Sequence, residues 1–109
     1  MSLAYKVLTA AEFAALLDGR FEGEAVDVAD GYVHLSTAGQ LTETVLRHFG
    51  GQEELVIAAV ELDRLGNSVR WEVSRRGEKF PHLYGRLTMA AVVAHAPLAW
   101  DASGEVAIP

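Results

Sequence analysis

The stretch ELVIAAVEL, Glu54–Leu62, decides the fold of this chain. It is a nearly continuous apolar run of strand length, which is typical of a central strand covered on both faces. Toward the N-terminus, LAYKVLT (Leu3–Thr9) alternates well enough for a second strand. Toward the C-terminus, VRWEVS (residues 69–74) alternates as well, with Arg70 and Glu72 on the face opposite Trp71. The chain is therefore built around a sheet.

Two helices are predicted from their capping residues and apolar spacing. TAAEFAALLDG begins with Thr9 and Glu12, which suit a capping box, and STAGQLTETVLRHFGG does the same with Thr37 and Gln40. The second helix should bury the stripe Leu41, Val45, Leu46 and Phe49. The segment between the helices, RFEGEAVDVADG, lacks periodicity and is expected to be a surface loop.

Shorter elements complete the prediction. We expect a strand at Tyr32–Leu35, an extended segment at residues 80–84, a helical turn at Thr88–Ala91, a strand near Val92–His95 and a terminal hairpin turning at Asp101–Gly104. The sum is one small α+β domain over residues 1–109. It should contain about five strands in a mixed or antiparallel sheet and two to three helices.

Composition narrows the functional classes. The 109 residues carry a net charge of -6, which argues against a duplex-DNA partner. Five of the nine lysines and arginines nevertheless lie between Arg70 and Arg86, so a small anionic ligand remains compatible with the sequence. The chain has no cysteine and no apolar run of membrane-spanning length. No signal peptide is visible, no metal site is expected, and we predict a cytoplasmic protein.

Two polar and aromatic segments are candidates for a site. In DGYVHLST (residues 30–37), His34 lies on a short strand, and Ser36 and Thr37 open a helix whose N-terminus could attract an anion. The plainer interpretation is that one hydroxyl only caps the helix and that His34 is a core histidine. Taken alone, this motif favours the plainer interpretation.

The second segment is RWEVSRRGEKFPHLYG, residues 70–85. Pro81 fixes an extended backbone, on which His82 and Tyr84 share one face. An imidazole and a phenol side by side can hydrogen-bond a ligand, and an aromatic ring can stack on a planar one. Arg70 and Glu72 could equally be a cross-strand ion pair and nothing more.

These motifs, in this order, resemble domain-of-unknown-function family 952, a family of small bacterial proteins. The matching elements are YKVL at Tyr5–Leu8, DGYVHLST at Asp30–Thr37, HF at His48–Phe49, RWE at Arg70–Glu72 and FPHLYG at Phe80–Gly85. The resemblance covers nearly the whole chain, and its two longer motifs are specific. It implies a shared fold but no named activity.

The chain is also similar, more distantly, to the ADP-ribosyltransferases and the NAD-dependent RNA 2′-phosphotransferases. That resemblance implies NAD as a cofactor, with His34 on the nicotinamide ribose, Tyr84 or Trp71 stacked on the nicotinamide and Glu72 as the assisting acid. His34, Glu72 and Tyr84 would then be catalytic. The residues expected to bind the cofactor or ligand are Ser36, Thr37, Arg70, Trp71, Arg75 and His82.

The functional hypotheses fall into different classes. One is an enzyme that uses NAD or a nucleotide in an ADP-ribosyl or phosphoryl transfer. The alternative is a non-catalytic module that binds a small anionic metabolite or a nucleotide. A structural or protein-interaction domain ranks behind both, because two long polar and aromatic motifs exceed what packing requires. The sequence does not predict the oligomeric state.

Overall fold

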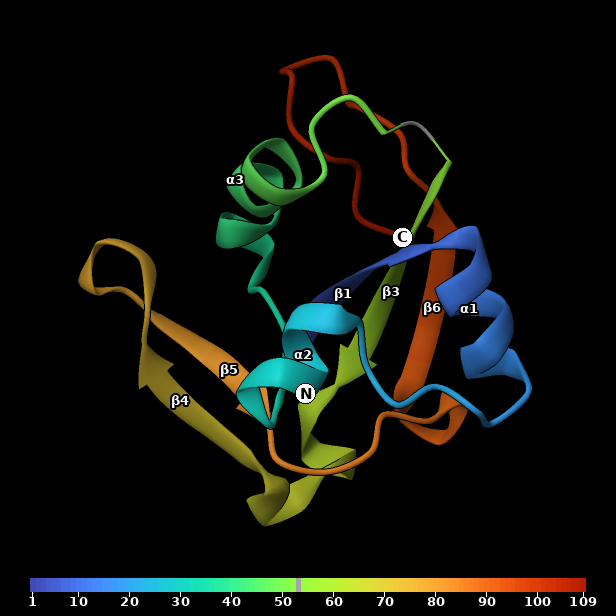
Figure 1. Ribbon diagram of the computed structural model, residues 1–109. Coiled ribbons are helices and arrows are strands. Elements are labelled where there is room, and N and C mark those ends of the chain that lie inside the picture. Colours follow the sequence, from blue (N-terminus) through green and yellow to red (C-terminus); the bar gives the residue numbers. More distant parts are fainter. Residues whose placement is uncertain (53) are drawn as a thin grey trace.

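The computed structural model describes residues 1–52 and 54–109. Within them, six strands form two three-stranded antiparallel sheets, accompanied by three α-helices (Figure 1). The predicted α+β class is confirmed. The strands do not join into the single sheet that we expected, because the short strand near His34 pairs away from the long central one.

The first sheet places β3 (Leu55–Glu61) between β1 (Leu3–Thr9) and β6 (Val92–Pro97), with both pairs antiparallel. The central strand predicted from the apolar run is therefore confirmed. Both of its faces are covered, one by the core shared with the second sheet and the other by the cluster packed against α3, which explains why its sequence is apolar almost throughout. The one-turn 3-10 helix at Met89–Ala91 precedes β6, where a helical turn was predicted.

The second sheet places β5 (Lys79–Leu83) between β2 (Val33–His34) and β4 (Val69–Val73). In Figure 1, β4 and β5 reach outward from the first sheet. Residues 32–37 connect the two sheets: the Leu35 N–H donates to Pro81 O (3.1 Å), and Ser36 exchanges two hydrogen bonds with Tyr5 of β1 (2.7 and 2.9 Å). This crossing segment brings the first candidate motif against both sheets.

The first and third helices begin directly after the predicted capping residues, Thr9 and Thr37. In α1 (Ala10–Leu17), Thr9 Oγ1 accepts from the Glu12 N–H (3.1 Å), and the Thr9 N–H donates to Glu12 Oε1 (2.8 Å). In α3 (Ala38–His48), Thr37 is the N-cap and its N–H donates to Gln40 Oε1 (3.0 Å). The buried stripe of α3 omits Leu46, which is 60% exposed, so that part of the prediction is wrong.

The segment predicted as a surface loop contains a further helix, α2 (Ala25–Asp30). Its start is stabilised by a carboxylate, because Asp27 Oδ2 accepts from the Glu24 N–H (2.9 Å). Val26 and Val28 are exposed, and the buried residue of α2 is Asp27. A helix held by a buried acid has no apolar stripe, which is why periodicity did not reveal it.

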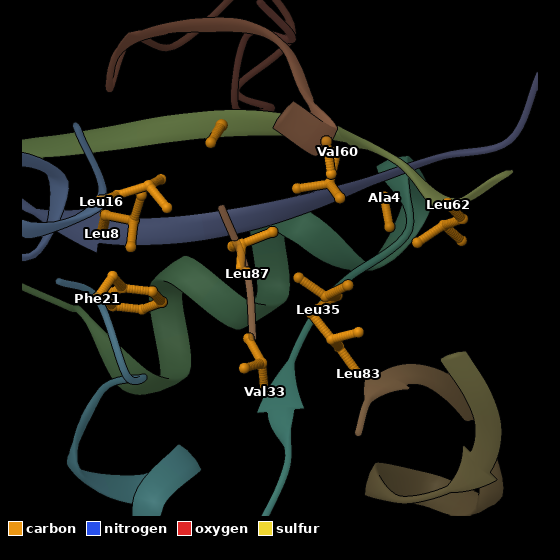
Figure 2. Close-up of a cluster of buried hydrophobic side chains, with 12 residues drawn as sticks. Ala4, Leu8, Leu16, Phe21, Val33, Leu35, Val60, Leu62, Leu83 and Leu87 are labelled. Carbon is orange, nitrogen blue, oxygen red and sulfur yellow. The ribbon is translucent and has the colours of Figure 1, made fainter. Parts of the chain in front are cut away.

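The main core lies where the two sheets meet. Figure 2 shows side chains from the crossing segment and the end of β5 converging on β1 and β3; they include Ala4, Leu8, Val33, Leu35, Val60, Leu83 and Leu87. A second cluster packs the other face of β1 and β3 against α3. Lys6 shares the strand face of Ala4 and Leu8, so a lysine lies within the apolar row.

The outer face of β4 is apolar but open. Trp71 and Val73 are exposed, whereas the polar face of the strand, with Arg70 and Glu72, is turned toward the histidines. At the C-terminus, the Asp101 N–H donates to Glu105 O (2.8 Å), forming the predicted terminal turn. None of the helices in the described residues has the length and apolar character needed to cross a membrane.

Candidate functional site

The two motif histidines are direct neighbours across the second sheet. His34 of β2 pairs with His82 of β5 in the antiparallel register, and their ring centroids lie 5.5 Å apart. The Tyr32 ring stacks on His82 at 4.1 Å and lies 4.7 Å from His34. Residues far apart in the sequence therefore form one aromatic and imidazole cluster.

His34 is held between two carboxylates of α2. Its Nδ1 lies 2.6 Å from Asp27 Oδ1, and its Nε2 lies 3.0 Å from Asp30 Oδ2. The helix that sequence patterning did not reveal thus supplies both partners of the ring. Each ring nitrogen of His34 already faces an acceptor.

Asp27 is the buried centre of this arrangement, with 2% of its surface exposed. It also accepts from the His34 N–H (3.0 Å), and its Oδ2 lies 2.9 Å from Lys6 Nζ. Burial alone would raise the pKa of Asp27, but the hydrogen bonds from His34 and the charge of Lys6 outweigh it and lower the pKa. The carboxylate is therefore ionised at neutral pH.

The lowered pKa of Asp27 predicts a specific loss of stability in acid. Because the folded pKa lies below the unfolded value of about 3.9, ionised Asp27 stabilises the fold at neutral pH, and this contribution is lost as the pH falls below about 4. We expect urea unfolding between about pH 2 and 7 to show a smaller acid loss for Asp27→Asn than for the natural chain. The exposed control Glu78→Gln should keep the natural pH dependence. Equal pH dependence for Asp27→Asn and the natural chain would contradict this account.

His82 is held by a second carboxylate, on β4. Its Nδ1 lies 2.8 Å from Glu72 Oε1, and the Tyr84 hydroxyl donates to the same oxygen (2.7 Å). The hydrogen bond from Tyr84, followed by that of His82, lowers the pKa of Glu72. The Arg70 guanidinium lies 4.9 Å from the centroid of the Tyr84 ring. One face of the second sheet therefore carries a connected group of four side chains: Arg70, Glu72, His82 and Tyr84.

A cavity of about 560 Å³ opens beside these rings. Its walls come from β1, α2, the crossing segment, α3 and the β4–β5 hairpin, and they combine apolar groups with convergent polar ones. Among the predicted site residues, those that line it are His34, Ser36, Arg75 and His82. The two motifs thus contribute to the same cavity.

The remaining predicted residues lie outside the lining. Glu72 contacts His82, which lines the cavity, and Tyr84 contacts Glu72. Arg70 lies one contact further away, over the Tyr84 ring. Thr37 serves as the N-cap of α3, and Trp71 is exposed on the far face of β4. The catalytic and ligand-binding roles expected for all these residues stay predictions.

Arg75 supplies the cationic wall. Its side chain is 11% exposed, its guanidinium lies 4.9 Å from the Phe80 ring, and its Nη2 donates weakly to Thr44 Oγ1 (3.4 Å). Nε is 3.3 Å from Glu43 Oε2, but the N–H is not aimed at that oxygen, and it has no hydrogen-bond partner among the described residues. Ser36 and Thr44 share a hydroxyl contact of 2.9 Å nearby.

Both histidine motifs lie within the part of the chain that matches a known protein family. The model of the family described as "Protein of unknown function (DUF952)" matches residues 7–95, which include both histidine motifs. The chain belongs to the DUF952 family. The family resemblance seen in the sequence is thereby confirmed, whereas the more distant one to ADP-ribosyltransferases stays a prediction.

Solved structures similar to this DUF952 chain come from Caulobacter crescentus. The crystal structure of protein CC0527 is 48% identical, with a TM-score of 0.86, and the match covers 97% of this chain and 94% of that one. The solution structure of CC0527 is 50% identical, with a TM-score of 0.79 and coverage of 96% and 91%. Their descriptions state no function, and no curated protein matches the chain.

The DUF952 motifs revealed both histidines and Glu72, the partner of His82, but not the partners of His34. Lys6, Asp27, Tyr32 and Thr44 were not predicted as site residues, and neither was Asp30, although it opens the first motif. The available signal was that Asp30 precedes His34 by four residues in the same motif, close enough for a carboxylate–imidazole contact. In the described part of the chain, no group of three histidine, aspartate or glutamate side chains is placed to hold a metal ion.

Proposed function

We propose that this DUF952 protein binds a small anionic ligand in the cavity between its two histidine motifs. The observation that carries the proposal is Arg75: a nearly buried guanidinium that lines the cavity and has an Nε–H without an acceptor among the described residues. A buried donor without an acceptor is costly, and a carboxylate or phosphate oxygen would satisfy it.

The charge around Arg75 also favours an anion. Glu43 lies within 3.4 Å of Arg47, 3.3 Å of Arg75 and 3.1 Å of Arg76, so one carboxylate is shared by three guanidinium groups. The balance of this cluster is positive although the chain is acidic as a whole, and on the other side of the cavity Glu24 is paired with Lys6. Arginine is the side chain best suited to bidentate contacts with carboxylate and phosphate.

The size and lining of the cavity fit a small molecule. A volume of about 560 Å³ lies within the usual range of ligand sites. The apolar wall includes Val7, Leu35 and Phe80, and the hydroxyls of Ser36 and Thr44 lie on the side of Arg75. A ligand with one anionic end and a compact body suits this combination.

The binding function has more support than NAD-dependent transfer. In the NAD hypothesis, His34 would bond the nicotinamide ribose, yet both of its ring nitrogens already face Asp27 and Asp30. Glu72, the acid assigned to that reaction, is engaged by His82 and Tyr84 and does not line the cavity. NAD turnover would require these contacts to be exchanged first.

Calorimetric titration with inorganic phosphate tests the proposal. We expect saturable binding at one site, beyond the response to sodium chloride at matched ionic strength. A phosphate response no larger than that of chloride would contradict the proposal. A parallel incubation with NAD separates the two functions, because release of nicotinamide would support transfer and its absence would leave binding.

A further inference from the structure

His82 is positioned to do more than line the cavity. Only 3% of its surface is exposed, and it faces the cavity from the central strand of the second sheet. Tyr32 stacks on one side of the ring at 4.1 Å between centroids, and the His34 ring meets it edge-on with the centroids 5.5 Å apart. With Nδ1 bound to Glu72, the ring is held in one orientation.

The partner of Nδ1 determines which ring nitrogen carries the proton. Hydrogen bonds from Tyr84 and His82 lower the pKa of Glu72, so this carboxylate is ionised at neutral pH and can only accept. Nδ1 must then donate, and in the neutral ring Nε2 carries a free lone pair. This is the reverse of the tautomer that free histidine prefers in water.

Nε2 has no hydrogen-bond partner within residues 1–52 and 54–109. Among these residues, Arg75 Nε is the side-chain atom that is both sealed from solvent and without a partner. His82 Nε2 also has no partner, so it is not sealed from solvent. The lone pair of Nε2 therefore reaches open volume rather than protein. An imidazole oriented by a carboxylate, with its second nitrogen open, is also the arrangement of a general base.

We infer that His82 Nε2 is a hydrogen-bond acceptor for a ligand in the cavity and that Glu72 is the residue that positions the His82 ring. This inference rests on the proposed anion-binding function and deepens it: the ligand brings a hydroxyl or ammonium group to His82 Nε2 while its anionic end meets Arg75. The guanidinium of Arg75 covers Phe80, which is two residues before His82 on the same strand face, about 7 Å away. The donor and the anion of the ligand should be separated by a comparable span.

The tautomer is measured without any ligand. In long-range ¹H–¹⁵N spectra at a pH where the histidines are neutral, His82 should show a protonated Nδ1 and an unprotonated Nε2. In Glu72→Ala the ring should revert to the Nε2–H form, whereas Tyr84→Phe should keep the Nδ1–H form because Glu72 is still present. An Nε2–H tautomer in the natural protein would overturn the inference even if neither variant folds.

The ligand part is tested with two phosphate esters that differ by one hydroxyl. We expect 3-hydroxypropyl phosphate to bind about 5-fold more tightly than propyl phosphate, in line with one added hydrogen bond. His82→Phe, which keeps a ring against Tyr32, should make the two affinities equal. Equal affinities in the natural protein would overturn the inference that His82 Nε2 accepts a hydrogen bond from the ligand. Failure of both esters to bind would overturn it together with the proposed function, while the tautomer is decided independently.

Discussion

Lys6→Met is expected to lower the free energy of unfolding by about 3–5 kcal/mol, the range for breaking one side of a buried ion pair. Lys6 is 1% exposed, and its Nζ lies 2.6 Å from Glu24 Oε1, 2.9 Å from Asp27 Oδ2 and 3.0 Å from His34 O. Methionine fills similar space but leaves the Asp27 carboxylate buried without its neighbouring ammonium group. The loss would be a large part of the ~5–15 kcal/mol typical of a domain.

Urea unfolding of matched variants measures this effect. Lys79→Met, at an exposed position on β5, should change the free energy of unfolding by less than about 0.5 kcal/mol. The double variant Lys6→Met/Asp27→Asn should recover part of the loss, because the unpaired buried charge is gone. A loss below about 1 kcal/mol for Lys6→Met alone would show that the buried ion pairs do not hold α2 on β1.

Arg75→Gln is expected to weaken phosphate binding by about 10- to 100-fold, the equivalent of losing hydrogen bonds to a charged group. Glutamine retains a polar end but loses the charge that lines the cavity beside Thr44. The matched control is Arg76→Gln, because Arg76 also contacts Glu43 but is exposed and does not line the cavity. We expect the control to change the affinity by less than about 3-fold, as is usual for a screened surface charge.

Calorimetry at constant ionic strength compares the two arginine variants. A similar loss for Arg75→Gln and Arg76→Gln would mean that phosphate responds to the general surface charge rather than to a built site. The unfolding of both variants should be measured alongside. In Arg75→Gln, Glu43 keeps its contacts with Arg47 and Arg76, so a loss of affinity need not come from a loss of fold.

The elements that could be predicted are those with a local signal. β3 has a long apolar run, and α1 and α3 begin with capping residues, so each was found close to its observed bounds. α2 was missed because a buried acid rather than an apolar stripe attaches it to the fold. The division into two sheets was also missed, since the strand at His34 is too short to show its pairing partner.

The site was predictable only in part, for a similar reason. The motifs identified His34 and His82, and strand alternation placed Arg70 and Glu72 on one face of β4. Alternation does not tell which face lies inside, and here the polar face is turned toward the histidines. Lys6 gave no signal as a site residue, because a lysine in a strand becomes a buried partner only when a distant carboxylate packs on it.

The most direct measurement is a phosphate titration followed through the arginine Nε–H resonances. The account predicts that the Arg75 resonance shifts and saturates at one site, while those of the exposed Arg76 and Arg20 change little. It also predicts that amide shifts gather around Ser36 and Thr44. A stationary Arg75 resonance, or shifts spread over the exposed arginines without saturation, would contradict the claim that this cavity is an anion site.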